Sequence, residues 1–427
     1  MVISSLFMGL SAFVAISDWP PAEESFSGYD PLTLPLPNYP FVNQQANRLL
    51  YPVGQNDVLN PVFETLDSIL FADTGKLSIV HLGGSHVQAG TLGNRMREHF
   101  QNLGYNLDAE RGLVFPYSLA HTNGQANVKV KYTGDWEGGR CAHNNQHCDW
   151  GMTGYNVLTD KDSTQVKLWS IRSDSTTYKF DKVTFLHALG GNAMHAELIG
   201  IATDSIYSDT AMQATVFMLS EAIDTLRFQV VGGDNYDLRG ILLENSNAAI
   251  TYHEIGVNGA STKSYLRSKR MEAELKLLSP DLVIFGIGIN DAYMTEDRFD
   301  PDLFETRYDS LIQRFQSANP NVRFLFLTNN DSYYRKRYPN KNALRVQTSM
   351  YRLSEKHGAA VWDLFEVMGG LNSIQAWEKA GLAKKDKIHF TSAGYTFQAD
   401  LLFEAFRSAY GDHLSTIDPL QKTKTAP

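Results

Sequence analysis

Apolar residues follow two patterns along the chain, and the first consists of short continuous runs that end in glycine or a polar turn. These runs lie at residues 77–82, 281–288, 323–328 and 359–364. Segments with apolar residues at helical spacing lie at residues 92–100, 303–315, 343–355 and from about 392 onward. Strands that are apolar throughout are buried on both faces, as in a parallel sheet covered by helices. The pattern therefore predicts a doubly wound α/β domain.

The second pattern covers residues 106–249, where apolar and polar residues alternate in short segments divided by Gly, Asn and Asp. These segments lie at residues 126–132, 165–170, 182–187, 213–218 and 225–230. Alternation of period two with a turn signal about every eight to twelve residues is typical of an antiparallel sandwich. We therefore expect an all-β sandwich inserted into the α/β domain, which resumes near Ile250.

The N-terminal 75 residues precede both patterns. Residues 2–16 are apolar and uncharged but too short to span a bilayer, which is typical of a signal-peptide core. Ala15 and Ser17 supply the small residues that cleavage needs, although no Lys or Arg precedes the apolar run. Residues 18–45 are rich in proline, which indicates an extended lead-in, and a helix is expected at 61–71.

Together these patterns predict the division of the chain. We expect a signal peptide at 1–17, an N-terminal extension at 18–75, a discontinuous α/β domain at 76–105 and 250–412, the inserted sandwich at 106–249, and a tail at 413–427. No later stretch is apolar for long enough to form a membrane span. The interpretation is an exported protein without a stable membrane span.

Composition excludes some classes of protein. The 427 residues are 43% hydrophobic, 11% aromatic and 20% charged, which is typical of an ordered globular protein rather than a disordered one. Lys and Arg total 38 against 47 for Asp and Glu, a formal net charge of -9. Nucleic-acid binding depends on basic surface, so this balance argues against such a partner. The oligomeric state is left open.

The two cysteines lie close together, in a segment that also contains two histidines. One interpretation is a small loop closed by a disulfide between Cys141 and Cys148, which an oxidising compartment would permit. The alternative is a metal site formed by both thiolates with His143 and His147, although ligands so close in sequence would be strained in tetrahedral geometry. We favour the disulfide.

Four short segments of the α/β part carry candidate chemistry. They are Gly83-Gly84-Ser85-His86, Gly256-Val-Asn258-Gly259, Gly286-Ile-Gly288-Ile-Asn290-Asp291 and Asp386-Lys-Ile-His389. Each alone is typical of a turn or a helix cap. The first three follow predicted strands, whose carboxyl ends form the edge where open α/β folds bind ligands.

The fourth segment has the spacing of an oriented general base. A carboxylate three residues before an imidazole can accept a hydrogen bond from one ring nitrogen and direct the other, as a serine nucleophile requires. The backbone N–H of Ser85 would lie near a helix N-terminus, which favours developing negative charge. The sequence thus favours a serine with an oriented general base at one edge of the sheet.

The four segments resemble the blocks of the SGNH (GDSL-type) hydrolase superfamily. The resemblance implies a flavodoxin-like parallel sheet and hydrolysis of acyl esters without a metal or organic cofactor. It implies that Ser85 is the nucleophile, His389 the general base and Asp386 the residue that orients it. It also implies an oxyanion hole formed by the N–H groups of Ser85 and Gly259 and the side chain of Asn290.

The insertion resembles the carbohydrate-binding-module-like sandwich of peptidoglycan O-acetylesterases and related carbohydrate esterases. This resemblance implies an O-acylated glycan or peptidoglycan as substrate. Aromatic residues of the insertion would either stack on sugar rings or form the sandwich core; these are Trp136, Trp150, Tyr155 and Trp169.

One residue departs from the family pattern. The first block of the family usually reads Gly-Asp-Ser, whereas this chain has Gly83-Gly84-Ser85. The missing aspartate normally supports the nucleophile turn, so Gly84 affects the expected rate more than the expected reaction. The leading hypothesis is a carbohydrate or peptidoglycan O-acetylesterase. The alternatives are an O-acyltransferase with the same residues and a non-catalytic glycan-binding protein on a degenerate hydrolase fold.

Overall fold

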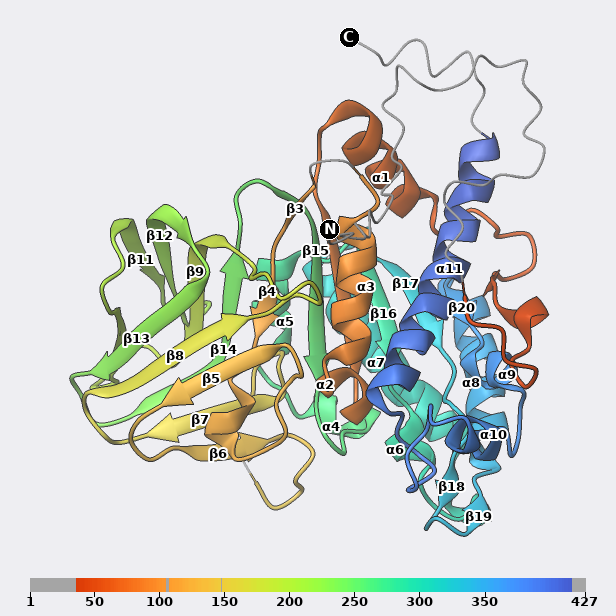
Figure 1. The fold of residues 1–427 in the computed structure, drawn as a ribbon. Coiled ribbons are helices and arrows are strands. Elements are labelled where there is room, and N and C mark those ends of the chain that lie inside the picture. The colour runs from red at the N-terminus through yellow and green to blue at the C-terminus, as the bar shows by residue number, and fades with distance from the viewer. Residues whose placement is uncertain (1–35, 105–106, 147, 417–427) are drawn as a thin grey trace, which may run out of the picture.

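The computed structural model describes residues 36–104, 107–146 and 148–416, and its centre is a seven-stranded sheet (Figure 1). From edge to edge the strands are β1 (Leu49–Leu50), β20 (Ala360–Trp362), β17 (Arg323–Leu327), β16 (Leu282–Gly286), β2 (Leu77–Gly83), β15 (Ala248–Gly256) and β3 (Asp108–Ala109). β1 is antiparallel to β20, and the other neighbours are parallel. The series β15-β2-β16-β17-β20 has the flavodoxin-like order of doubly wound sheets. The predicted α/β fold is confirmed.

Both faces of the sheet are buried. Successive side chains of a strand point to opposite faces, so each strand contributes to the core on both sides. In β16, Val283 and Phe285 belong to one core cluster, and Leu282 and Ile284 to the other. One face is covered by α5 (Met271–Leu278), α7 (Pro301–Ala318) and α8 (Asn342–His357). The other is covered by α1 (Asn60–Ala72), α3 (Thr91–Gln101) and α11 (Ser392–Thr416) (Figure 1).

Short elements complete the α/β domain. They are α2 (Ser85–Gln88), α4 (Thr262–Leu266), α6 (Ile289–Ala292), α9 (Leu364–Met368), α10 (Ile374–Lys379), the 3-10 helices at Gln44–Ala46 and Glu296–Arg298, and the small hairpin of β18 (Tyr333–Tyr334) and β19 (Tyr338–Pro339). No helix among the described residues has both the length and the apolar character needed to cross a membrane.

Part of the segment expected as an N-terminal extension belongs to this domain. β1 pairs with β20, and the ring of Phe63 on α1 lies edge-on to Phe406 of α11 with centroids 5.5 Å apart. The helix α11 runs to Thr416, beyond the predicted domain end at 412. The apolar run expected as a signal peptide lies outside the described residues.

The inserted segment forms two antiparallel sheets (Figure 1). One contains β10 (His195–Leu198), β13 (Thr225–Val231), β8 (Thr164–Ser170) and β5 (Val128–Tyr132). The other contains β11 (Thr203–Asp209), β12 (Ala214–Ile223), β9 (Phe180–His187), β14 (Tyr236–Glu244), β7 (Tyr155–Thr159), β6 (Glu137–Arg140) and, beside β14, β4 (Gly112–Val114). Phe185 and Phe228 join the two sheets, with ring centroids 4.9 Å apart. The predicted β insertion is confirmed.

Strand β14 lies inside its sheet, yet its pattern gives no clear strand signal. Its buried residue Arg239 pairs with Glu274 of α5, at 3.0 Å with both side chains buried. Glu274 also accepts the N–H of Met152 at 2.7 Å. A buried ion pair thus connects the inserted domain to the α/β domain.

Candidate active site

Ser85 stands where β2 turns into the short helix α2, at the carboxyl edge of the parallel sheet. Position 83 requires glycine because a Cβ there would lie 2.4 Å from Cγ2 of Val87 and 3.0 Å from the carbonyl oxygen of Gly286. Gly286 ends the neighbouring strand β16, so Ser85 lies at the point where the strand order reverses. Doubly wound sheets bind their ligands at this point.

The side chains of Ser85, His389 and Asp386 form one hydrogen-bonded chain. Oγ of Ser85 lies 2.8 Å from Nε2 of His389, and Nδ1 of His389 lies 2.9 Å from Oδ2 of Asp386. The other carboxylate oxygen, Oδ1, accepts the backbone N–H groups of Ile388 and His389, each at 2.9 Å. The three residues that the resemblance assigned to catalysis are therefore in direct contact.

Asp386 fixes which ring nitrogen of His389 carries the proton. Burial acts to raise the pKa of Asp386, but the hydrogen bonds from His389 and Ile388 outweigh it and hold that pKa below its ordinary value. The carboxylate is therefore ionised at neutral pH and accepts the Nδ1 proton. The lone pair of Nε2 then faces the hydroxyl of Ser85.

Asn290 and Gly259 come from two further turns at the same edge. Gly259 has a φ of +79°, a conformation that glycine adopts without strain. Nδ2 of Asn290 donates to the carbonyl oxygen of Ala260 at 2.8 Å and lies 3.1 Å from where a Cβ on Gly84 would stand. Within the described chain the N–H groups of Ser85 and Gly259 donate no hydrogen bond. They remain free to bind a ligand oxygen.

Asp291 ties the two donor turns together. Its buried carboxylate accepts the backbone N–H of Thr262 at 3.0 Å and the hydroxyl of the same residue at 2.6 Å, at the start of α4. Burial raises the pKa of Asp291 to about 6 in spite of these bonds. The structure therefore brings all four predicted segments to one edge of the sheet.

Comparison with known protein families agrees with this geometry. Residues 232–397 match the model of the GDSL-like lipase/acylhydrolase family. This part of the chain is similar to a GDSL-like acylhydrolase domain. The resemblance to the SGNH superfamily, stated from the four segments, is confirmed, although the matched range does not include Ser85. No curated protein matches the chain by sequence.

Several solved structures resemble this chain at low sequence identity. A peptidoglycan O-acetylesterase superposes with a TM-score of 0.67 at 20% identity, over 85% of this chain and 99% of the other. An acetyl xylan esterase matches with a TM-score of 0.29 at 22% identity, over 36% of this chain and 81% of the other. A GDSL-like lipase from Bacteroides thetaiotaomicron matches with a TM-score of 0.30 at 18% identity, over 37% and 76%. The first match is long enough to include the inserted sheets.

Gly84 is the residue at which the acylhydrolase domain departs from the usual first block. It is the N-cap residue of α2, with a φ of -96° and a ψ of -139°. A Cβ at this position would lie 3.1 Å from Nδ2 of Asn290, so a side chain would displace the amide by a few tenths of an ångström. Glycine therefore permits the close approach of Asn290.

His86 is a site residue to which sequence reasoning assigned no role. Its ring stacks on His389, with centroids 5.2 Å apart and planes inclined by 28°, and its Nδ1 lies 3.1 Å from the hydroxyl of Tyr395. Burial, reinforced by the proximity of His389, lowers the pKa of His86 to about 3. Its place directly after Ser85 was the signal for a site residue, but position alone specifies no contact.

The predicted disulfide is wrong, because Cys141 and Cys148 are free thiols. Cys141 extends the β6–β7 pairing through its N–H to the carbonyl of Gly154 at 2.8 Å, and its Sγ lies 2.9 Å from where a Cβ on Gly154 would stand. Sγ of Cys148 lies 3.1 Å from the corresponding position on Gly139. The two sulfurs thus pack over different glycines. Burial raises the pKa of the Cys141 thiol to about 12.

The structure also decides between the two interpretations of most aromatic residues. Trp136, Trp150 and Tyr155 are at most 4% exposed and belong to the core, so they do not stack on sugar rings. Trp169 is partly exposed, and the ammonium of Lys167 lies 5.2 Å from its ring centre. In the described ranges no group of three or more His, Cys, Asp and Glu residues has the arrangement of a metal site.

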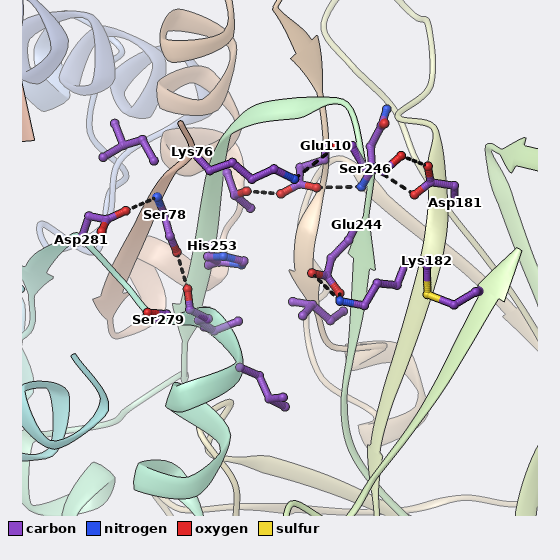
Figure 2. Close-up of a pocket in the computed structure, with 17 residues that line it drawn as sticks. Lys76, Ser78, Glu110, Asp181, Lys182, Glu244, Ser246, His253, Ser279 and Asp281 are labelled. Carbon is purple, nitrogen blue, oxygen red and sulfur yellow. Dashed lines mark hydrogen bonds and ion pairs between the residues drawn. The ribbon is translucent and has the colours of Figure 1, made fainter. Parts of the chain in front are cut away.

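A large cavity lies away from this site, between the inserted domain and the amino ends of the parallel strands. Its volume is about 480 Å³, and charged and polar side chains from both domains line it (Figure 2). Lys76, Ser78 and Asp281 come from the α/β domain, and Asp181 and Lys182 from β9. None of the four segments of the acylhydrolase site contributes to its lining.

Proposed function

We propose that the protein is a serine ester hydrolase that removes acyl groups, acetyl in the first place, from a carbohydrate such as peptidoglycan. The observation that carries this proposal is the hydrogen-bonded chain from Ser85 through His389 to Asp386. The acylhydrolase domain and the fold similarity to a peptidoglycan O-acetylesterase over both domains support it.

In the proposed first step, Oγ of Ser85 attacks the ester carbonyl carbon while Nε2 of His389 takes the hydroxyl proton. The separation of 2.8 Å is within reach for this transfer. His389 becomes positively charged, and the ionised Asp386 stabilises that charge through the Nδ1–H hydrogen bond.

The carbonyl oxygen becomes negatively charged in the tetrahedral intermediate. The N–H groups of Ser85 and Gly259 and the side-chain N–H of Asn290 would donate hydrogen bonds to it. A single donor of this kind contributes roughly 100- to 1000-fold to the rate. Asp291 holds the Asn290 turn against α4, which keeps these donors in place before substrate binds.

Collapse of the intermediate breaks the bond between the acyl carbon and the sugar oxygen, and His389 protonates the leaving alkoxide. Water, deprotonated by the same ring, then releases the acyl group from Ser85. The side chains of His389 and Asp386 are 32% and 29% exposed, so solvent reaches this position. That exposure favours hydrolysis over transfer of the acyl group to a second glycan.

The proposed substrate also carries the expectation of export, because peptidoglycan lies outside the cytoplasm. Detection of the mature N-terminus after secretion by its own host would test this part. A start at residue 18 supports cleavage of the apolar segment, and a protein retained with that segment in the cytoplasm contradicts export.

The experiment for the reaction compares Ser85→Ala with the wild type and with a matched control, Ser78→Ala. Ser78 lies on the same strand at its other end, where its hydroxyl donates to the carbonyl of Leu278 at 2.7 Å. Wild type and control should hydrolyse p-nitrophenyl acetate and react with a fluorophosphonate, and Ser85→Ala should do neither. Full activity of Ser85→Ala contradicts the nucleophile. An inactive wild type favours the non-catalytic glycan-binding alternative.

The substrate class is tested by acetate release from O-acetylated peptidoglycan and from acetylated xylan. We expect faster release from peptidoglycan. Preference for xylan would support the esterase reaction but contradict peptidoglycan as the substrate. Appearance of acetylated acceptor glycan in place of acetate would indicate the O-acyltransferase.

A further inference from the structure

A small polar cavity lies beneath α2, between the ends of β2, β16 and β17 and the side of α11. Its volume is about 30 Å³. Its lining includes the polar residues His81, His86, Asn329 and Gln398, which are at most 8% exposed.

Each of these four residues has one buried polar atom without a hydrogen-bond partner in the described chain. The atoms are Nε2 of His81, Nε2 of His86, Nδ2 of Asn329 and Oε1 of Gln398. Buried polar atoms are rarely left unsatisfied because each has lost its hydrogen bond to solvent. Four of them around one cavity indicate a common polar partner.

The opposite nitrogen of each histidine ring is anchored. Nδ1 of His81 lies 2.8 Å from the hydroxyl of Tyr252, and Nδ1 of His86 lies 3.1 Å from the hydroxyl of Tyr395. Both Nε2 atoms therefore point away from the tyrosines. A Cβ on Gly286 would lie 2.9 Å from Nε2 of His81, so the glycine leaves space at that nitrogen.

Water suits this cavity in size and in chemistry. The volume is close to the share of one water molecule in the liquid, and a buried water needs two to four polar partners. Burial holds both rings neutral, so each offers one nitrogen that either donates or accepts. Water satisfies either state, because it donates and accepts equally well.

The cavity is connected to the catalytic chain through the ring of His86. One face of that ring lies on His389 with centroids 5.2 Å apart, and the rings of Phe390 and Tyr395 meet it edge-on at 5.8 and 5.6 Å. We propose that the cavity holds an ordered water bonded to His81, His86, Asn329 and Gln398, and that His86, fixed between this water and Tyr395, is a positioning residue for the ring of His389. This proposal rests on the proposed function, in which His389 is the general base.

The neutral state of His86 matters because the reaction gives His389 a positive charge. The charged or titratable groups that influence His86 are His389, Asp386 and Lys384, and Tyr395 contacts it directly. A second cation stacked on His389 would oppose its protonation. A neutral ring held by hydrogen bonds at both nitrogens supports the geometry without that repulsion.

The first test needs no variant. A high-resolution crystal structure of the full chain should show ordered density in the cavity within hydrogen-bond distance of Nε2 of His81 and of His86. A cavity without such density would overturn the water site.

The second test compares Gln398→Met with Gln101→Met. Gln101 is a matched control because it is also a buried glutamine whose Oε1 has no partner among the described residues, and it lies on α3 outside the site. With p-nitrophenyl acetate, Gln398→Met should lower kcat about tenfold with KM unchanged, since small displacements of a general base reduce the rate strongly. It should also move the acid limb of the kcat/KM pH profile, while the control changes neither.

A third variant, His86→Phe, covers the case in which Gln398→Met does not fold. It keeps an aromatic ring on His389 but loses both hydrogen bonds, and the same kinetic changes are expected. Wild-type kcat and pH profile in the folded variants, with Ser85→Ala inactive, would contradict the positioning role and leave the proposed function intact. Activity in Ser85→Ala would contradict the proposed function itself, and the crystallographic test of the water site would still apply.

Discussion

The two ends of the parallel sheet are formed by the same strands, but their polar groups differ in whether they have hydrogen-bond partners within the protein. At the amino ends, around the cavity of about 480 Å³, several polar groups bond to one another. Lys182 pairs with Glu244 at 3.0 Å, and Asp281 accepts the N–H of Ser78 at 2.8 Å (Figure 2). At the carboxyl ends, the N–H groups of Ser85 and Gly259 have no acceptor in the described part of the chain and lie at the same edge as an oriented histidine.

This difference teaches that the volume of a cavity is a poor guide to chemistry. At the carboxyl end each strand passes into a turn and a helix, so backbone donors accumulate at one edge without internal acceptors. At the amino end the strands begin beneath the inserted domain, and polar groups there bond to one another within each domain and, between Thr251 and Glu110, across the two. We therefore expect substitutions at the carboxyl end to change turnover, and substitutions at the amino end to change stability.

Apart from loss of the nucleophile, Asp386→Asn should have the largest effect on kcat, and the matched change at the amino end should have none. An amide at this position cannot stabilise the imidazolium and favours the wrong tautomer of His389. We expect kcat for p-nitrophenyl acetate to fall about 10⁴-fold. The matched change at the amino end, Asp281→Asn, should leave kcat at the wild-type value. A loss of less than tenfold in Asp386→Asn would mean that another group orients His389.

The next effect is that of Asn290→Ala. Loss of one donor to the oxyanion should lower kcat by roughly 100- to 1000-fold, with little change in KM, because the bond forms fully only in the transition state. Steady-state kinetics on the chromogenic ester measures both. A raised KM with unchanged kcat would instead show that Asn290 binds the ground state only.

Much of this contrast could be predicted from the sequence, because the carboxyl edge carries local signals. The continuous apolar runs predicted β2, β16, β17 and β20, and the polar residues that follow them marked the edge. Asp386 and His389 are three residues apart, so their contact is a local property of one turn.

The parts that sequence did not predict depend on contacts between distant segments. His86 meets Tyr395 and His389 across about 300 residues, and His81 faces Gly286 from another strand. Arg239 of β14 is buried beside a partner, Glu274, that lies in the other domain. The prediction of a disulfide was wrong for a related reason, because closeness of two cysteines in sequence does not determine where their sulfurs point.

A smaller effect is expected of Gly84→Ala. The Cβ of the alanine would press on Nδ2 of Asn290 from 3.1 Å. A displacement of a few tenths of an ångström should lower kcat by roughly three- to tenfold. The thermal midpoint should stay within a few degrees of the wild type. An unchanged kcat would show that Asn290 yields without losing its contact to the oxyanion.

Glu110→Gln, at the amino end of the sheet, is expected to leave turnover unchanged. Glu110 accepts hydrogen bonds from Thr251 and from the N–H of Asn245, at 2.7 Å for the latter. Burial nevertheless raises its pKa from about 4.5 to about 7. The native state therefore holds this proton more tightly than the unfolded chain, and the stability it contributes is complete below pH 4.5 and lost as pH rises through 7.

As the pH rises from 5 to 8, deprotonation of Glu110 should lower the free energy of unfolding of the wild type by about 2–3 kcal/mol. Glu110→Gln has no proton to lose at this position and should not show this decrease. Urea unfolding of both proteins at the two pH values measures the difference. Esterase activity at a fixed pH serves as the control and should be equal in the two proteins. Equal pH dependence of unfolding would mean that Glu110 keeps an ordinary pKa. A loss of activity with unchanged stability would mean that the two ends of the sheet are coupled, and the division between turnover and stability would not hold.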